Sequence, residues 1–236
     1  MRIDKLLANM GYGSRKEIKD IVRAGQVTVN GVVIKDVKQH VQVETDRVEY
    51  AGELIEYKEH VYFMLHKPQG VISATEDTRE RTVIDLLQGR DKAFSVFPVG
   101  RLDKDTEGLL LLTNDGQLAH QLLSPKKHIP KLYFAHIEGT VTEEDKLAFA
   151  DGVTLDDGYK TMPAELNILR SDSRSEIELT IMEGKFHQVK RMFLARGKKV
   201  TYLKRMAMGT LHLDGELLLG HYRELTNEEL ELLKKG

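Results

Sequence analysis

The sequence contains no cysteine and no tryptophan, and only five of its 236 residues are proline. Without cysteine the chain cannot form disulfides or thiolate–zinc sites. No apolar run approaches the roughly 18 residues that a membrane-spanning helix needs, and Met1 leads directly into an amphipathic segment instead of a signal peptide. Hydrophobic residues make up 41% and charged residues 31%, which is typical of a folded globular protein. We therefore expect a cytoplasmic protein with one large domain or two small ones.

Charge is distributed unevenly along the chain, although the formal net charge is only −2. Residues 1–40 carry eight Lys and Arg against four Asp and Glu, whereas residues 41–60 carry two against six. Residues 184–205 carry eight Lys and Arg and no acidic residue. A polyanion responds to such local patches and not to the sum over the chain. The two basic regions are compatible either with ordinary solvated surface or with a nucleic acid partner.

The first forty residues predict two helices followed by a hairpin. Apolar residues between positions 3 and 10 recur at helical spacing. Ser14 and Glu17 form the capping-box pattern at the start of a second helix. Asn30-Gly31 then lies between valine-rich segments, which is a strong signal for a hairpin turn.

This small module resembles the S4 RNA-binding domain of ribosomal proteins and RNA-modifying enzymes. The resemblance rests on residues 2–7, 11–15 and 25–31, which occur in the order that the family shows. The exposed face of the second helix would present a basic row suited to phosphate contacts, namely Arg15, Lys16, Lys19 and Arg23. The alternative is a helical cap domain with an ordinary basic surface. We assign residues 1–58 to the S4-like domain and residues 59–236 to a second, catalytic domain.

The second domain is predicted to be α+β, with a mainly antiparallel sheet flanked by helices. Strands and helices alternate irregularly, without the repeated βαβ pattern of a parallel sheet. The predicted strands are residues 61–65, 96–100, 109–112, 132–137 and 177–182, and the predicted helices are residues 117–123, 142–150, 185–195 and a terminal helix from position 226.

A charged loop between two apolar strands is the most informative segment. Residues 100–116 read Gly-Arg-Leu-Asp-Lys-Asp-Thr-Glu-Gly-Leu-Leu-Leu-Leu-Thr-Asn-Asp-Gly, with carboxylates at alternate positions from Asp103 to Glu107. Composition alone leaves three interpretations: a structural turn, a glycosidase pair formed by Asp103 and Glu107, or a cation-binding loop. Arg101 and Lys104 disfavour a cation, and the histidines show no metal-ligand spacing, so we expect no metal.

The same loop is very similar to the catalytic motif of ribosomal RNA pseudouridine synthases of the small-subunit type and of the related large-subunit type. Three further blocks match in the family's order: His-Lys-Pro-Gln-Gly at 66–70, Lys-Leu-Tyr at 131–133 and Glu-Gly-Lys-Phe-His-Gln-Val-Lys-Arg-Met at 183–192. With the S4-like module, the resemblance covers nearly the whole chain. It disfavours the glycosidase interpretation, because an RNA-binding module has no use in such an enzyme.

The resemblance implies a role for each of five residues. Asp103 is the essential carboxylate, acting either as a nucleophile on the ribose or as a base that gives a glycal. Lys190 keeps Asp103 ionised, at a position where much of the family has arginine. Tyr133 stacks on the flipped-out base and Leu203 closes the base pocket. Arg101 contacts the RNA backbone or fills the space that the base leaves. The reaction has no redox step, so no cofactor is expected.

The target RNA is predicted from two short segments that are closer to the small-subunit branch. These are Ser-Pro-Lys-Lys-His at 124–128 and Met-Ala-Met-Gly at 206–209. The sequence thus predicts a monomeric enzyme that modifies one uridine of 16S rRNA, either free or within a small-subunit assembly particle. Two alternatives stay open: a 23S rRNA enzyme of the same family, and a non-catalytic S4-type RNA-binding or assembly protein. The intact set of Asp103, Tyr133 and Lys190 argues against the non-catalytic alternative.

Overall fold

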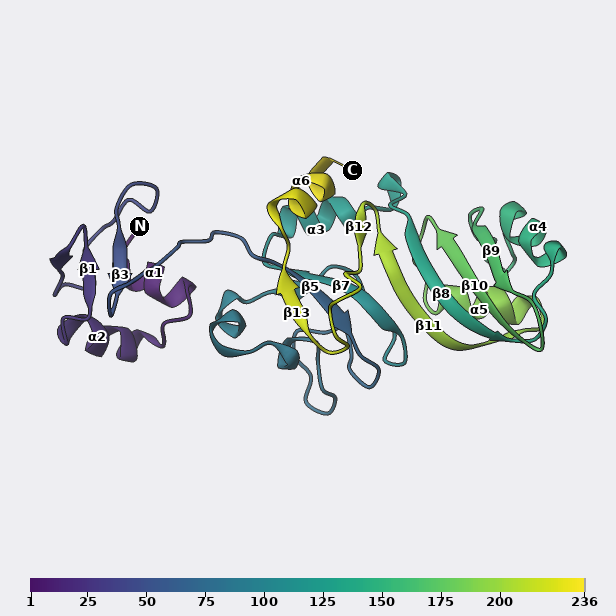
Figure 1. The fold of residues 1–236 in the computed structure, drawn as a ribbon, viewed down its shortest axis with the longest axis horizontal. Coiled ribbons are helices and arrows are strands. Elements are labelled where there is room, and N and C mark those ends of the chain that lie inside the picture. The colour runs from purple at the N-terminus through teal and green to yellow at the C-terminus, as the bar shows by residue number, and fades with distance from the viewer. Residues whose placement is uncertain (236) are drawn as a thin grey trace. The chain divides into compact units, whose positions relative to one another are not determined.

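A computed structural model describes residues 1–235, and their contacts divide the chain into two compact units (Figure 1). The N-terminal unit comprises Met1–Val61 together with Leu87–Val96. The C-terminal unit comprises Tyr62–Leu86 and the chain from Phe97 onward. The domain boundary near residue 58 stays a prediction. The structure adds a feature that the sequence did not suggest, because Leu87–Val96 lies within the stretch assigned to the second domain and yet packs with the first unit.

The N-terminal unit has the predicted order of two helices and a hairpin. Its four-stranded antiparallel sheet has the order β2-β1-β3-β4. Its elements are α1 (Ile3–Asn9), α2 (Arg15–Arg23), β1 (Val27–Val29), β2 (Val32–Val33), β3 (Val48–Tyr50), β4 (Glu53–Leu54) and the short 3₁₀ helix η2 (Gly89–Phe94).

Local sequence signals explain where these elements begin and turn. Ser14 Oγ accepts a hydrogen bond from the Glu17 amide at 3.4 Å, and the Glu17 carboxylate accepts one from the Ser14 amide at 2.7 Å. This capping box satisfies two amide groups at the start of α2. Asn30 and Gly31 both have positive φ, at 53° and 79°, as the tight turn between two antiparallel strands requires. Both predicted signals are confirmed.

The C-terminal unit is built on a mainly antiparallel sheet with the main order β13-β5-β7-β11-β8-β10-β9. Among the strand pairs of the described chain, only β7 and β11 run parallel. The strands are β5 (Tyr62–Lys67), β6 (Phe97–Pro98), β7 (Glu107–Thr113), β8 (Lys131–Glu138), β9 (Glu165–Arg170), β10 (Arg174–Ile181), β11 (Lys199–Met208), β12 (Leu211–His212) and β13 (Tyr222–Glu224). The helices are η1 (Ile84–Leu86), α3 (Gly116–Leu123), η3 (Pro125–Lys127), α4 (Glu143–Asp151), α5 (Gln188–Ala195) and α6 (Asn227–Lys235). The α+β prediction is confirmed.

Strand β7 forms the centre of this unit's core. Its four consecutive leucines at 109–112 are all fully buried, which requires packing on both faces of the sheet. Helices α3 and α6 lie together beside β5 and β7 (Figure 1), and Leu118, Leu122 and Leu233 join the same apolar cluster. The charged loop 101–106 leads directly into this strand, so it is attached to a fully buried part of the unit.

Helix α5 begins later than predicted. The sequence suggested a helix over residues 185–195, but α5 spans Gln188–Ala195. The cause is His187, which adopts the left-handed conformation with φ 49° immediately before the helix. Residues 183–187 thereby form a loop. From α5, Phe193 packs edge-to-face on Phe149 of α4, with 4.9 Å between ring centroids.

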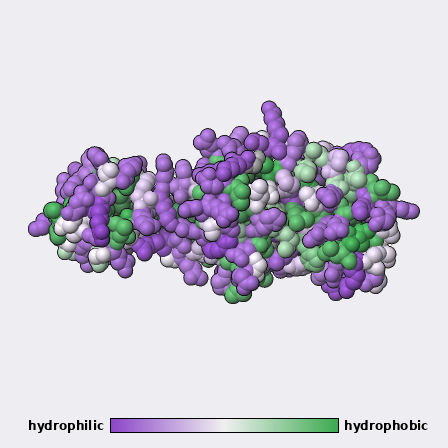
Figure 2. Space-filling view, turned by 45° about the horizontal axis from the view of Figure 1, so that its top comes forward, coloured by the Kyte–Doolittle hydropathy of each residue, from purple (hydrophilic) through white to green (hydrophobic). Residues whose placement is uncertain are grey.

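The surface is mostly hydrophilic, with apolar residues gathered over the end of the C-terminal unit that holds β8, β10 and α4 (Figure 2). Exposed apolar side chains include Leu147 on α4, Phe186 in the loop before α5 and Leu194 on α5. Within residues 1–235, no helix combines the length and the apolar character needed to cross a membrane.

Candidate active site

Gly108 allows the charged loop and its strand to lie tightly against β11. A Cβ atom at this position would stand 2.2 Å from the carbonyl oxygen of Arg205, and its φ of +108° is also unfavourable for other residues. In the parallel pairing of β7 with β11, Glu107 lies opposite Lys204 and Gly108 opposite Arg205. The close approach of Arg205 therefore explains why position 108 is a glycine.

Lys67 anchors the charged loop by hydrogen bonds to its backbone. Its side chain is fully buried at the end of β5, and Nζ donates to the carbonyl oxygens of Pro68 at 3.0 Å, Asp103 at 2.9 Å and Thr106 at 2.9 Å. Burial lowers the pKa of Lys67 to about 8, although nearby carboxylates including Asp103 oppose the shift. Sequence reasoning gave this lysine no role. Its signal was its place in the His-Lys-Pro-Gln-Gly block at 66–70, one of the blocks on which the family resemblance rests.

The Asp103 carboxylate faces two side chains from the 183–192 block. Lys190 Nζ lies 2.8 Å from Asp103 Oδ2 and 2.6 Å from Asp105 Oδ1. His187 Nε2 lies 3.6 Å from Asp103 Oδ1, a position that depends on the left-handed backbone of His187. The structure thus brings Lys190 to Asp103, and it adds Asp105 and His187, which sequence reasoning had not placed there.

These contacts keep Lys190 charged. Burial acts to lower the pKa of Lys190, but its hydrogen bonds to Asp103 and Asp105 outweigh burial and raise that pKa. For Asp105, burial acts to raise the pKa, but the hydrogen bond and the positive charge of Lys190 lower it. The site therefore holds one cation between two carboxylates.

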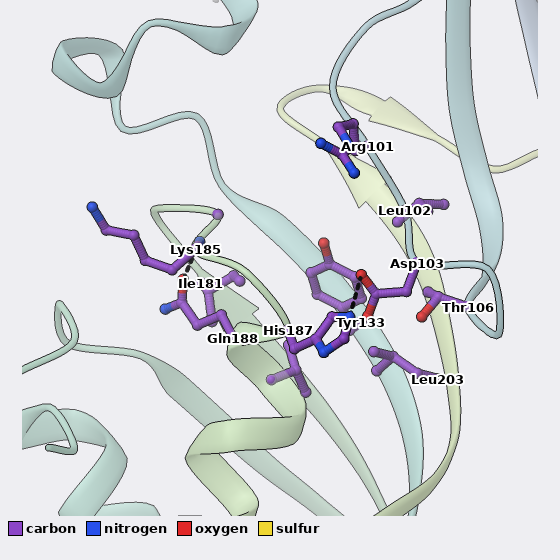
Figure 3. Close-up of a pocket in the computed structure, with 12 residues that line it drawn as sticks. Arg101, Leu102, Asp103, Thr106, Tyr133, Ile181, Lys185, His187, Gln188 and Leu203 are labelled. Atoms are coloured by element: carbon purple, nitrogen blue, oxygen red, sulfur yellow. Dashed lines mark hydrogen bonds and ion pairs between the residues drawn. The ribbon is translucent and has the colours of Figure 1, made fainter. Parts of the chain in front are cut away.

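A pocket opens beside the Asp103 carboxylate (Figure 3). Tyr133 of β8 and Leu203 of β11 form its wall, and both are buried. Arg101 lies at the exposed edge, and Thr106 contributes a buried Oγ1 that has no hydrogen-bond partner among the described residues. The sequence-predicted set of Arg101, Asp103, Tyr133 and Leu203 thus lines one pocket, and Lys190 reaches it through its bond to Asp103. Within residues 1–235, no group of three or more His, Asp or Glu side chains could hold a metal ion.

The loop before α5 is fixed by the buried Gln188. Its side-chain oxygen accepts from the Lys185 amide at 2.8 Å, and its Nε2 donates to Glu183 at 2.8 Å. Glu183 also accepts from the hydroxyl of Tyr159 at 2.6 Å and from the Met162 amide at 2.9 Å. This network fixes the backbone that carries His187 to the Asp103 carboxylate.

A basic groove lies within the N-terminal unit. Arg15 and Lys19 line it, together with Lys5 and Lys38, which sequence reasoning had not selected. Lys16 and Arg23 are exposed on α2 but are not among the residues that line the groove. The predicted basic row therefore divides into two residues in the groove and two outside it.

Comparison with known proteins identifies the family. The model of the RNA pseudouridylate synthase family matches residues 61–195, and that of the S4 domain matches residues 1–48. The chain belongs to the RNA pseudouridylate synthase family. The family match covers the Asp103 loop, Tyr133 and Lys190. The chain is therefore an RNA pseudouridine synthase, which is an isomerase, with an S4 domain before the synthase domain, and the predictions of enzyme and family are confirmed.

Relatives of this synthase span essentially the whole chain. An uncharacterized RNA pseudouridine synthase of Bacillus subtilis is 56% identical over 100% of this chain and 99% of its own. The ribosomal large subunit pseudouridine synthase B of the same species is 40% identical, with 99% and 95% covered. The ribosomal small subunit pseudouridine synthase A of Escherichia coli K12 is 38% identical, with 98% of each chain covered. A crystal structure of a pseudouridylate synthase, also 38% identical, superposes with a TM-score of 0.69 over 99% of both chains.

Proposed function

We propose that this synthase converts one uridine of 16S small-subunit rRNA to pseudouridine, with Asp103 as its catalytic residue. The supporting observation is the position of the Asp103 carboxylate, which lies against Lys190 at the pocket lined by Tyr133 and Leu203. We expect the enzyme to act as a monomer in the cytoplasm, on free RNA or on a small-subunit assembly particle.

The reaction needs an ionised carboxylate in a site that excludes water. It breaks the bond from N1 of uracil to ribose C1′, turns the base and joins C5 to C1′, after which C5 loses its proton and N1 gains one. Asp103 either attacks C1′ or removes a ribose proton to give a glycal. Both routes start from the charged form of Asp103, whose Oδ2 lies 2.8 Å from the Lys190 ammonium.

The remaining residues would hold the RNA. The uridine must leave its stack to reach Asp103. In our proposal its ring rests on Tyr133, and Leu203 closes the pocket from β11. The exposed Arg101 contacts the backbone or fills the space that the base leaves. Arg15, Lys16, Lys19 and Arg23 of the S4 domain would contact phosphates, the first and third from within the basic groove.

The choice of 16S rRNA rests on residues 124–128 and 206–209, which are closer to the small-subunit branch. A competing target is 23S rRNA. It is favoured by the 40% identity to a Bacillus subtilis enzyme that is named for the large subunit. The proposed catalytic residues are the same for either target RNA.

Pseudouridine mapping tests the proposal directly. Purified 16S rRNA, 23S rRNA and small-subunit particles are incubated with the protein, and new pseudouridines are located by reverse transcription after carbodiimide treatment. A single new site in 16S rRNA is the expected result. A site in 23S rRNA would retain the chemistry and overturn the choice of RNA. RNA that is bound but not modified would support the non-catalytic alternative.

Lys190 should tolerate arginine but not an uncharged residue. Lys190→Met removes the cation between Asp103 and Asp105. Breaking such a partly buried charge pair costs about 2–3 kcal/mol, so we expect kcat/KM to fall by about a hundredfold. Lys190→Arg keeps the charge and should lose less than about tenfold. Single-turnover assays measure both, with Lys199→Met, an exposed lysine at the start of β11, as the control. Equal losses in the Met and Arg variants would contradict the electrostatic role.

A further inference from the structure

A second pocket, here called the side pocket, opens next to the one at Asp103. The two share Arg101, Tyr133, Gly184 and Lys185 in their linings. The side pocket extends between the ends of β8, β10 and β11, where Lys131, Met182, Arg205 and Met208 line it. Nothing in the reaction at Asp103 requires this space.

Two cations in the side pocket have donors that the protein does not use. Arg205 is only 2% exposed, and its Nε donates to the Leu109 carbonyl at 2.8 Å. Its buried Nη2 has no hydrogen-bond partner among the described residues. A buried polar group without a partner is destabilising, and a ligand is one explanation for it. Lys131 donates to the Ile129 carbonyl at 2.7 Å, which leaves further N–H groups of its ammonium for another acceptor.

The charge balance of the side pocket favours an acceptor ligand. Burial, followed by the positive charge of Arg205, lowers the pKa of Lys131, and Glu183 opposes this shift. The Glu183 carboxylate already accepts hydrogen bonds from Tyr159, Gln188 and the Met162 amide. It therefore does not neutralise the two cations by direct contact, and a ligand oxygen between them would relieve their repulsion.

The walls of the side pocket suit a flat aromatic group. Met162, Met182, Met208 and Ile129 form an apolar lining, and methionine sulfur and methyl groups pack well on aromatic faces. Tyr159 adds a ring, over which Lys185 Nζ lies 4.5 Å from the centroid. A phosphate would make no use of these walls, whereas a nucleobase would use both the walls and the donors.

We propose that the side pocket binds the base of a nucleotide next to the target uridine, and that Lys131 and Arg205 recognise its carbonyl oxygen. The inference rests on the proposed function of the Asp103 pocket. Because Tyr133 and Arg101 border both pockets, an occupant of the side pocket lies beside the uridine bound at Asp103. Uracil, guanine and cytosine carry a ring carbonyl and adenine does not, so the side pocket selects against adenine at that position. Ser124, His128 and Met208, from the segments on which the choice of 16S rRNA rests, also line it.

The test uses an RNA fragment that carries the uridine found by mapping, from whichever rRNA contains it. Each flanking nucleotide is made abasic in turn, or is changed to adenine. An abasic nucleotide keeps the phosphate and removes the base, so it separates the two possible ligands. We expect one of the two abasic fragments to lose about tenfold in kcat/KM, because base–aromatic stacking and its hydrogen bonds are lost. The other should change less than about twofold.

Three variants, one of them a control, complete the test. Met182→Trp puts a larger side chain into the lining of the side pocket, and Met182 is 37% exposed, so the substitution does not disturb the core. It should lower kcat/KM on the intact fragment by about tenfold, with no further loss on the abasic fragment. Leu147→Trp on the exposed face of α4 is the matched control and should behave as the wild-type enzyme. Lys131→Met should abolish the discrimination against adenine.

Three results would overturn the inference. The first is that neither abasic fragment loses kcat/KM. The second is that the losses caused by Met182→Trp and by the abasic fragment multiply when the two are combined. The third is that Lys131→Met lowers kcat/KM although neither abasic fragment does, which would indicate that the side pocket binds a phosphate. Turnover of the intact fragment by the wild-type enzyme is measured first, so a failure of the proposed function is recognised separately. The affinity of the Asp103→Asn variant for the same fragments gives a second readout that does not depend on turnover.

Discussion

Asp103→Asn should abolish pseudouridine formation while RNA affinity stays within a few-fold of the wild type. The amide is nearly isosteric with the carboxylate, but it can neither attack C1′ nor remove a ribose proton. We expect kcat to fall by at least about a thousandfold, as when a catalytic nucleophile or base is removed. Lys190 keeps an anionic partner in Asp105, 2.6 Å away, so the variant should still fold. Quantitative mapping at the target uridine and filter binding measure the two quantities.

Asp105→Asn is the matched control, since the neighbouring carboxylate contacts the same lysine. Its side chain is 69% exposed, so removal of its charge is screened by water. The expected loss in kcat is therefore below about tenfold. If the Asp105 variant were inactive and the Asp103 variant active, the catalytic assignment would have to move to Asp105.

Lys67→Met should produce a second large loss of activity without touching the RNA. The substitution keeps the volume of the side chain but removes the donor that Pro68, Asp103 and Thr106 share through their carbonyls. The Asp103 carbonyl retains the Thr106 amide at 3.0 Å, whereas the other two lose a buried bond. A catalytic group displaced by about 1 Å can lose about a hundredfold in rate, and we expect a loss of that order in kcat. Single-turnover assays measure this loss. An unchanged kcat would show that the position of the Asp103 loop does not depend on Lys67.

Lys67 also predicts a pH dependence of stability. Burial lowers the pKa of Lys67 to about 8 from an ordinary value of 10.5. Between these values the unfolded chain binds more protons than the folded chain, so the free energy of unfolding rises with pH. Relative to Lys67→Met, the wild type should gain up to about 1 kcal/mol per pH unit in this window, and the gain is lost as pH falls through 8. Urea titrations at several pH values compare the two proteins, and parallel curves would contradict the pKa shift.

The elements with strong local signals were predictable from the sequence. Examples are the capping box at Ser14, the Asn30-Gly31 turn and the four leucines of β7. Strands β9, β11, β12 and β13 were not predicted. Strand β11 has a half-exposed, charge-bearing sequence whose strand character comes from pairing with β7 and β8. The strand conformation of these segments comes from pairing with neighbouring strands and not from local propensity.

The site was predictable only where a motif carried it. Asp103, Tyr133 and Lys190 came from blocks that resemble a family, and the structure brings them together. Lys67 and His187 stand in blocks of the same resemblance, but their contacts with the Asp103 loop depend on packing across the sheet and on one left-handed backbone angle. A single sequence gives no signal for such distant contacts, because they arise only when β5, β7 and α5 pack.

The placement of Leu87–Val96 in the N-terminal unit limits how this unit could be replaced by another RNA-binding module. Arg90 lies over the Tyr12 ring, 4.6 Å from its centroid, and Phe94 packs on the core of the N-terminal unit. The chain thus passes between the units at residues 61–62, 86–87 and 96–97. A gene fusion that joined a new targeting module at one junction near residue 60 would leave this internal segment without its apolar partners. Recombination of the synthase with other modules therefore has to replace two separate stretches of the gene together.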